Sequence, residues 1–405
     1  MSVRVTTANQ FNNAVASLQR RQQELQATQT QLTSGKKVER ASDDPVGAAR
    51  IERALAAIGR VDANQRALES SRNGMNLAEA AIGDASELLQ QVREAVVAAG
   101  NASYSDAERK GLGDKIAGLR AQLLSIANRP DGSGGYVFSG QGASQPPFLD
   151  ESTGVRFNGV PGSLLTGTLE SFALTVDGRL TWEQGRSGNG SFVTSDRPNT
   201  LTNAPAKGWI DPGRVTDPAL LTGHNYQIDI SGTAPNSTYT VTDLDTGGVV
   251  AADNFTPGKA INFDGMTVSI NAGGADGDSF RIEPATNTLN IFTVLDRAAA
   301  NLRTPLRSNI EIQQGNALSL RDLDQGFQNL QSVRSLVGER LNLLDGSEDR
   351  LSGLKLYNQI ERSAAEDLDM TEAISRFQIQ QTSYDAALRS YAAVQRVNLF
   401  QYLNF

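Results

Sequence analysis

The sequence contains few residues whose types and spacing could support chemistry. His224 is the single histidine in 405 residues, and there is no cysteine. A catalytic triad or a zinc site needs several histidine, cysteine or carboxylate partners around one centre, so we interpret His224 as a loop residue. Neither G-x-G-x-x-G nor G-x-x-x-x-G-K-[ST] occurs, which leaves nucleotide binding unsupported. The sequence therefore predicts no enzyme activity, no cofactor and no metal site.

One glycine-rich acidic segment has a faint likeness to a calcium-binding repeat. It reads Gly273-Gly-Ala-Asp276-Gly-Asp278 and occurs once. Because Ser-Phe-Arg-Ile follows it, we interpret the segment as a turn that enters a β-strand. Other acidic pairs in the middle of the chain are typical of an acidic surface, and nothing selects one of them for acid–base work.

The net charge is concentrated in the middle of the chain. The formal charge is −8, and residues 136–287 carry eight basic and sixteen acidic groups, which is the same net value. Phosphate binding needs a basic surface, so this balance argues against nucleic acid as a partner. No apolar run approaches 18 residues, and the first 31 residues lack a charged start followed by an apolar core. We therefore expect neither membrane insertion nor a cleavable signal peptide.

The elements begin with an amphipathic helix over residues 8–34. Four charged residues precede position 35, and a polar face with so few charges can be buried by hydrogen bonding. We expect this helix to pack on more than one side. Its heptad seam has Phe or Leu at the d positions and Gln at two a positions: Phe11, Val15, Leu18, Gln22, Leu25, Gln29 and Leu32.

A tight corner is expected to end this first helix and begin the second. Gly35 suits the left-handed conformation that follows a helix. Ser42, Asp43 and Asp44 offer N-cap oxygens, and Pro45 suits a first helical position, where its missing N–H costs nothing. The sequence therefore predicts a helix–turn–helix corner here.

A much longer helical pattern follows from Pro45 to about Ala99 without internal proline. At 1.5 Å per residue, about 55 residues span roughly 80 Å, which is wider than a globular core. Such a helix needs partners along its length, as in a coiled coil or bundle. Ser105-Asp-Ala-Glu108 forms a capping box that begins a third helix, and Pro130-Asp-Gly-Ser-Gly-Gly135 ends it.

Alternation with a period of two replaces the helical spacing at Tyr136. Turn residues recur every 8–12 positions up to about residue 285, which favours a sandwich or barrel-like β domain. A weak point near Pro198–Pro218 leaves open whether there are one or two lobes. Strands are expected at Tyr136–Phe138, Phe172–Val176, Tyr226–Ile230, Ser237–Val241 and Thr267–Ile270.

Helical spacing returns at Leu289, pauses at Thr304-Pro305 and continues from about Gly315 to Leu344. Asp345-Gly346-Ser347 predicts a turn, after which a last helix runs to the chain end. Its seam again has glutamine among apolar residues: Ile374, Phe377, Gln381, Tyr384, Leu388, Tyr391 and Gln395. Two seams of the same kind at opposite ends of the chain can pair with each other.

We therefore predict an α+β protein in which discontinuous N- and C-terminal helices form a coiled-coil or bundle rod around an inserted all-β, sandwich-like outer domain. The predicted segments are an N-terminal axial helix with its corner, the two halves of the helical rod on either side of the β domain, and a C-terminal axial helix. Their bounds are 1–44, 45–135, 136–287, 288–346 and 347–405.

The corner residues Gly35-Lys36-Lys37-Val38 and Ala41-Ser42-Asp43-Asp44-Pro45 resemble the N-terminal signature of the bacterial flagellin superfamily. The segment from Phe377 to Leu403 is similar to the C-terminal helix of the hook-associated proteins and flagellin. Within the superfamily, Gly135-Tyr-Val-Phe-Ser-Gly140 resembles the subunits that join hook to filament. Flagellin usually has Gly-x-Arg-Ile before its Asp-Asp pair. This chain has Gly35-Lys-Lys-Val instead, and the difference favours a junction subunit over a filament subunit.

The resemblance implies a structural function in the flagellum. It implies export through the flagellar type III channel to an extracellular position, with the terminal helices in the inner axial layers. Implied partners are other copies of the chain in a ring, the first hook-associated protein, flagellin and an export chaperone. The resemblance also implies ends that become ordered on assembly, because a lone helix cannot offset about 1–2 kcal/mol of backbone entropy per residue.

Two sets of residues follow as candidate contacts. The candidate assembly residues are Phe11, Val15, Leu18, Leu25, Leu32, Ile374, Phe377, Tyr384, Leu388 and Tyr391. The candidate chaperone-binding residues form an apolar stripe on the last helix: Phe377, Leu388, Tyr391, Val394 and Leu399.

Three other interpretations remain open at the level of sequence. The seams could be the core of an ordinary monomeric helical bundle. The chain could be a minor flagellin that polymerises into filaments. It could also be a surface sugar-binding protein or an enzyme that acts through its β domain.

Overall fold

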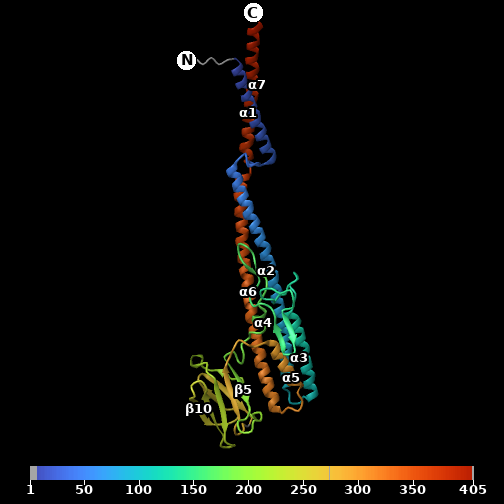
Figure 1. The fold of residues 1–405 in the computed structure, drawn as a ribbon, viewed down its shortest axis with the longest axis vertical. Helices are drawn as coiled ribbons and strands as arrows, with labels where there is room; N and C mark the ends of the chain where they lie inside the picture. The colour runs from blue at the N-terminus through green and yellow to red at the C-terminus, as the bar shows by residue number, and fades with distance from the viewer. Residues whose placement is uncertain (1–6, 273, 404–405) are drawn as a thin grey trace. The chain divides into compact units, whose positions relative to one another are not determined.

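The computed structural model describes residues 7–272 and 274–403, with side chains from Phe11 to Ala393 apart from the gap. The described chain divides into two compact units. One combines the residues up to Gln65 with those from Ser347 onward, and the other comprises Arg66–Gly346. The α+β class predicted from sequence is confirmed, since helical terminal segments flank an all-β middle part (Figure 1).

Most of the predicted helices are present with nearly the predicted ends. The long second helix has the predicted bounds, because no proline interrupts it and apolar residues recur along it. The helices are α1 (Thr7–Ser34), α2 (Pro45–Ala99), α3 (Asp106–Ala127), α4 (Gly178–Trp182), α5 (Ile291–Arg303), α6 (Asn309–Glu366) and α7 (Met370–Leu403).

The corner between α1 and α2 forms as predicted. Gly35 has φ +68° and its N–H donates to the Gln31 carbonyl over 2.8 Å, which ends α1 in a left-handed residue. Asp44 caps α2, because its carboxylate accepts hydrogen bonds from the N–H groups of Val46 (3.0 Å) and Gly47 (2.9 Å). Pro45 is the first residue of α2.

The turn predicted at Asp345–Ser347 is wrong, because α6 continues through it to Glu366. Leu344 and Leu351 are buried on either side of the glycine, so packing holds the helix together against the local preference for a turn. The chain breaks instead at 367–369, where the Asp369 carboxylate caps α7 by accepting from Thr371 N–H (2.9 Å). The boundary between the two compact units nevertheless falls between Gly346 and Ser347, inside α6.

In the second unit, α3 packs closely on α5. The Ser105–Glu108 capping box is confirmed, with Ser105 N–H donating to Glu108 Oε2 over 2.7 Å. Gly113 permits the close approach, since a Cβ atom there would lie 2.9 Å from the Ala299 carbonyl oxygen. Leu119 and Leu123 of α3 are buried at this contact face.

The β part consists of two small hairpins and a sandwich, all antiparallel where paired. Strand pairs β1–β2 and β3–β4 form the hairpins. A five-stranded sheet has the order β10-β9-β8-β13-β5, and a second sheet has the order β11-β12-β6 with β7 also on β12. The strands are β1 (Phe148–Glu151), β2 (Gly154–Phe157), β3 (Leu165–Thr166), β4 (Phe172–Ala173), β5 (Phe192–Arg197), β6 (Trp209–Ile210), β7 (Arg214–Val215), β8 (Tyr226–Ser231), β9 (Thr238–Asp243), β10 (Val249–Asn254), β11 (Ala260–Phe263), β12 (Met266–Asn271) and β13 (Ser279–Pro284).

The sandwich core comes from alternate residues of the two sheets. Strand β8 buries Tyr226, Ile228 and Ile230, and β12 buries Val268 and Ile270 against them. This alternation is the period-two pattern seen in the sequence, with one face of each sheet turned to the core.

Two expected strands of the β part need correction, and the open question of one or two lobes is answered. Residues 136–138 are not a strand, since Tyr136 forms only an isolated bridge with Pro130 and the chain turns at the next two residues. The ring of Phe138 lies 5.2 Å from that of Trp182. Of the strand expected at Phe172–Val176, only Phe172–Ala173 pairs. The weak point near Pro198–Pro218 is no division between lobes, since Phe192 before it and Ile210 within it belong to the same core.

Candidate assembly interface

The two predicted terminal seams meet in the structure. Helix α1 packs antiparallel on α7 (Figure 1), since Phe11 and Tyr391 form one contact, with ring centroids 5.9 Å apart. Nearer the corner, Thr28 Oγ1 donates to Gln380 Oε1 over 2.7 Å. Thr28 is a buried polar residue of this pair, and the seam analysis missed it because position 28 lies between the seam positions Leu25 and Gln29.

The α1–α7 pair leaves much of both seams accessible. Phe11 is 49% exposed, Ile374 46% and Leu388 40%. The other apolar residues of the seams are each half-buried: Val15, Leu18, Leu25, Leu32, Phe377, Tyr384 and Tyr391. Two helices cannot cover all sides of one another, so these apolar side chains remain available to further partners. The side chains of Val394 and Leu399 lie outside the described residues.

Sequence reasoning also missed exposed apolar residues beside the seam. Ile379 is 64% exposed although it lies within the α7 segment that carries the seam. A second group occupies the end of α6, which the predicted turn had assigned to a different helix: Leu354, Leu356, Tyr357 and Ile360. The recurrence of apolar residues over Leu354–Ile360 was the sequence signal that could have identified this group.

The Gly-Lys-Lys corner docks on the break between α6 and α7. Lys37 N–H donates to the Glu366 carbonyl over 2.7 Å, and Leu368 N–H donates to the Gly35 carbonyl over 3.0 Å. Lys36 Nζ lies 2.6 Å from Glu366 Oε1. The family-motif residues and the distant helix break therefore form one structural joint, which no local sequence rule predicts.

The Glu366 carboxylate is the electrostatic centre of this joint. Its side chain is largely buried, and Arg362 Nε lies 2.6 Å from its second oxygen. Hydrogen bonds from Arg362 and then from Lys36 hold the pKa of Glu366 below its usual value. Within the same corner, Asp43 Oδ2 accepts from Arg40 N–H over 2.8 Å, and Ser42 Oγ lies 3.4 Å from Asp43 Oδ1.

We predict that Glu366→Gln loosens this joint by roughly 1 kcal/mol, because a neutral amide loses the charge-assisted bonds. The amide protons of Lys37 and Leu368 should then exchange with solvent about five times faster, as measured by hydrogen–deuterium exchange. The wild-type contribution is present above the ordinary carboxyl pKa of about 4.3 and is lost as the pH falls through the lowered pKa of Glu366. The exposed Glu361→Gln is the matched control, and equal protection in both variants would contradict the assignment.

The single histidine has a structural partner. His224 Nδ1 lies 2.8 Å from Asp243 Oδ2, and Asp245 supplies a further oxygen within 4.8 Å of both ligand atoms. The other oxygen of Asp243 accepts from the N–H groups of Asp245 (2.9 Å) and Thr246 (3.2 Å), so this carboxylate is used to hold the β9–β10 turn. We assign the cluster to the turn and propose no metal site there.

The environment separates the pKa values of this pair. The hydrogen bond to Asp243 raises the pKa of His224. Burial alone would raise the pKa of Asp243, but the hydrogen bonds from His224, Thr246 and Asp245 outweigh it and set the pKa at about 2.

We predict that the sandwich loses stability as the pH rises from 6 to 9. The raised pKa of His224 means that its contribution is fully present below the ordinary histidine pKa of about 6.5 and is lost as the pH passes the folded-state value. Asp243 stays ionised throughout this range. Urea unfolding followed by Trp209 fluorescence in β6 should show the loss in the wild type and not in His224→Asn. A pH slope that persists in the variant would assign the effect to another group.

Residues 274–278 of the glycine-rich acidic segment form a turn that enters β13, as interpreted from the sequence, and Gly273 lies outside the described residues. The fully buried Asp278 carboxylate accepts hydrogen bonds from the N–H groups of Ala275 (2.8 Å), Lys207 (3.0 Å) and Gly208 (3.2 Å). Asn199 Nδ2 adds a fourth bond over 2.8 Å. The aspartate therefore organises the loop that leads to β6.

Among the described helices, none is both long enough and apolar enough to cross a membrane. Comparison with known families matches residues 5–143 to the bacterial flagellin N-terminal helical region. Residues 202–284 match the D2-like domain of flagellar hook-associated protein 1. The first match spans α1 to α3 and the corner motif, and the second lies within the sandwich.

Relatives that match over most of the chain include junction subunits. Flagellar hook-associated protein 3 of Salmonella typhimurium is 23% identical over 411 residues, covering 98% of this chain and 99% of the relative. A crystal structure of hook-associated protein 3 from Legionella pneumophila is 28% identical, with a TM-score of 0.68, covering 78% of this chain and 97% of that one. The flagellar junction protein FlgL of Xanthomonas campestris is 26% identical with a TM-score of 0.66, covering 77% and 99%.

Filament subunits match either over a shorter part of the chain or, as polar flagellin C of Vibrio parahaemolyticus does, over 92% of it at 22% identity. The flagellin of Bacillus subtilis is 32% identical over 120 residues, which is 28% of this chain and 38% of that protein. Matches of sequence, of structure and of the N-terminal family region thus agree with the corner motif and the paired terminal seams. Over nearly its whole length the chain is therefore similar to flagellar hook-associated protein 3, a structural subunit of the junction between hook and filament, and its N-terminal part matches the bacterial flagellin N-terminal helical region.

Proposed function

We propose that this chain joins hook to filament by assembling through α1 and α7, with the seam residues buried between neighbouring subunits. The observation that carries the proposal is the incomplete cover of those seams. Phe11, Ile374 and Leu388 each keep two-fifths or more of their surface exposed although α1 and α7 already pack on each other. At about 25 cal/mol per Å² of apolar surface, burying such stripes between subunits supplies free energy for assembly.

Partners follow from this mode of assembly. Other copies of the chain would form a ring, with the first hook-associated protein on one side and flagellin on the other. Related seams in all three proteins would let one packing mode continue across the junction, so the subunit adapts one lattice to the next. The work is mechanical, and we assign no catalytic role to any residue.

Before assembly the same surfaces need protection. We propose that an export chaperone covers the apolar stripe of α7, where Phe377, Leu388 and Tyr391 lie among the described side chains. The chain would then pass through the flagellar type III channel to an extracellular position. A chaperone that buries these residues would prevent premature pairing of the seams.

Deletion of the gene tests the proposed function directly. We expect hooks without filaments, together with monomeric flagellin in the culture medium. Intact filaments and unchanged swimming would contradict the proposal. A seed assay separates junction subunit from minor flagellin: purified protein added to short filament fragments should not extend them, whereas a flagellin would extend them continuously.

A further inference from the structure

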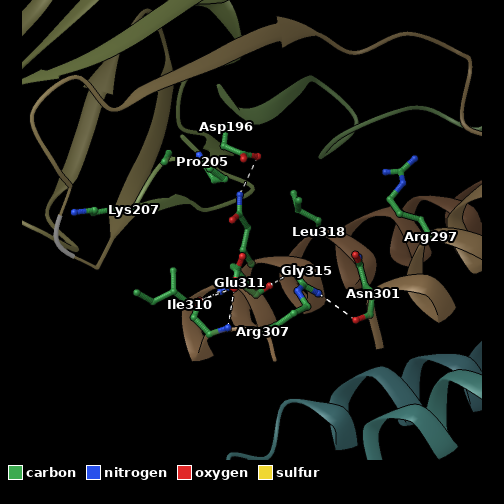
Figure 2. Close-up of a pocket in the computed structure, with 13 residues that line it drawn as sticks. Asp196, Pro205, Lys207, Arg297, Asn301, Arg307, Ile310, Glu311, Gly315 and Leu318 are labelled. Carbon is green, nitrogen blue, oxygen red and sulfur yellow. Dashed lines mark hydrogen bonds between the residues drawn. The ribbon is translucent and has the colours of Figure 1, made fainter. Parts of the chain in front are cut away.

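The cleft between β5 and α6 carries balanced charge (Figure 2). Arg297 in its lining is paired with Asp322 over 3.0 Å. The other charged side chains of the lining are two acidic and two basic residues: Asp196, Glu311, Lys207 and Arg307. The cleft therefore favours neither an acidic nor a basic partner. Exposed apolar side chains without charge among them gather elsewhere, on the helices of the unit that combines both chain ends.

Helices α1 and α7 each carry three rows of residues at seven-residue spacing, and their contact covers two of the rows. Leu25 and Thr28 represent the covered rows of α1, and Tyr384 and Gln380 those of α7, since all four are buried or half-buried. The third row of each helix is largely exposed. Its members are Val15, Gln22 and Gln29 on α1 and Ile374, Gln381 and Leu388 on α7. Three such rows are typical of a helix in a bundle, whereas two suffice for a two-stranded coiled coil.

Both third rows lie on the same side of the α1–α7 pair. Gln29 directly follows Thr28, and Gln381 directly follows Gln380, the two residues that meet over 2.7 Å. Each following residue is turned by about 100° in the same sense. Because the two helices run in opposite directions, these equal turns bring both rows to one side. We call the surface of the six third-row residues the glutamine face.

The end of α6 has an exposed surface of similar character, which we call the α6 stripe. Its residues are 46–61% exposed: Leu354, Leu356, Tyr357 and Ile360. Ile360 lies nine residues after the fully buried Leu351, which is about two and a half turns and therefore the opposite side of the helix. Lys355 bonds Asp62 of α2 over 2.8 Å. A helix segment with apolar residues on opposite sides is typical of one that is buried on both.

The glutamine face and the α6 stripe fit each other in size and chemistry. From Val15 to Gln29, and from Ile374 to Leu388, the face is roughly 21 Å long at 1.5 Å per residue. The stripe is about 9 Å long by the same measure, and it belongs to one helix, as a surface between two helices requires. Neither surface includes a charged residue. The hydroxyl of Tyr357 can bond a glutamine amide, which has both donors and an acceptor.

The stripe cannot reach the glutamine face of its own chain. Helix α6 is continuous up to Glu366. Helices α1 and α7 extend from the other side of the joint, where Gly35 and Leu368 are hydrogen-bonded (Figure 1). Each chain thus has one face and one stripe that it cannot join itself. This is the arrangement required for head-to-tail contact between identical subunits.

We propose that the α6 stripe of one copy packs on the glutamine face of a second copy and completes a three-helix bundle with its α1 and α7. The inference rests on the proposed function, because a head-to-tail contact of this kind closes into a ring when the rotation per subunit allows it. It names the surface that covers the exposed seams in the assembly, and it gives the exposed residues at the end of α6 a partner.

Photo-cross-linking tests this contact without assuming its register. A tagged chain with Leu356→p-benzoylphenylalanine replaces the wild type in cells, and purified flagella are irradiated. We expect a band of two linked copies on denaturing gels, since a link within one chain leaves a single-copy band. Mass spectrometry should find residue 356 linked to the tryptic peptides 22–36 or 377–389, which carry most of the glutamine face.

A reciprocal probe and a matched control sharpen the test. Gln29→p-benzoylphenylalanine should link to the tryptic peptide 356–362 of a second copy. The control is Leu343→p-benzoylphenylalanine, because Leu343 is a 63% exposed leucine of the same helix outside the stripe. Adding Ile360→Asp to the Gln29 probe should reduce linkage at least about tenfold, because a carboxylate loses its water in the contact. The neighbouring exposed Gln359→Asp should preserve linkage.

The outcomes separate the two proposals. If the wild-type chain is absent from purified flagella, the proposed function fails and the docking inference fails with it. If the chain is present but the Leu356 probe links to flagellin, to other peptides or to nothing, the docking inference alone is overturned. Equal linkage by the Leu343 control, or equal effects of Ile360→Asp and Gln359→Asp, would also overturn it. Where the Leu356 variant is not incorporated, the Gln29 probe decides by its linkage to peptide 356–362.

Discussion

Replacing Leu388 with aspartate is expected to abolish incorporation of the subunit into the flagellum while the β domain stays folded. Leu388 is 40% exposed on α7, beside the α1–α7 contact, and we place it at the interface with neighbouring subunits. Burying an unpaired carboxylate there costs several kcal/mol. Since each 1.4 kcal/mol lowers an association constant tenfold, assembly should fall by at least about 100-fold.

The measurement is the amount of the chain in purified flagella, with swimming as a second readout. Leu220→Asp is the matched control, because Leu220 is an exposed leucine of the short 3-10 helix Pro218–Leu220, outside α1 and α7. Trp209 fluorescence reports that the sandwich of each variant is folded. Normal incorporation of Leu388→Asp would refute the assignment of the α7 seam to assembly.

Replacing Asp278 with alanine is expected to have the largest effect on the stability of the sandwich. The substitution leaves three buried or partly buried N–H groups and the Asn199 amide without their common acceptor. An unsatisfied donor costs about 1–3 kcal/mol, so the combined loss should reach about 3–5 kcal/mol, a range that point mutations seldom exceed. The loop that carries Lys207 should lose its fixed position at the same time.

Urea unfolding followed through Trp209 measures this effect. A Trp182→Phe background removes the second tryptophan, whose indole N–H has no acceptor among the described residues. Asp276→Asn is the control, because Asp276 accepts the N–H of Gly232 (2.8 Å) at an exposed position and should cost below about 1 kcal/mol. Unchanged stability in Asp278→Ala would mean that water replaces the carboxylate in these bonds.

Several features could be predicted from the sequence because local rules decide them. Heptad spacing and the absence of internal proline give α2 its predicted bounds. The capping groups Asp44 and Ser105, and the left-handed Gly35, mark helix ends by hydrogen bonds within a few residues. Period-two alternation identified the strands around Tyr226 and Thr267 because each has one face in the sandwich core.

Other features depended on residues far apart in the chain. Local preference favoured a turn at Asp345-Gly346-Ser347, but burial of Leu344 and Leu351 keeps α6 continuous there. In the same way, residues 136–138 form a turn in place of the expected strand, and Phe138 packs on Trp182. In both places, tertiary packing contributes more free energy than the local propensities, which amount to about 1 kcal/mol per residue or less.

The candidate interface likewise combines features that local rules decide with features that depend on distant residues. The sequence by itself determined the two glutamine-containing seams and the Gly-Lys-Lys corner, since seam periodicity and turn chemistry are local. Only the tertiary structure decided that Phe11 meets Tyr391 and that Lys36 pairs with Glu366. These are contacts between residues tens to hundreds of positions apart, and their geometry follows from chain topology, which periodicity and spacing do not specify.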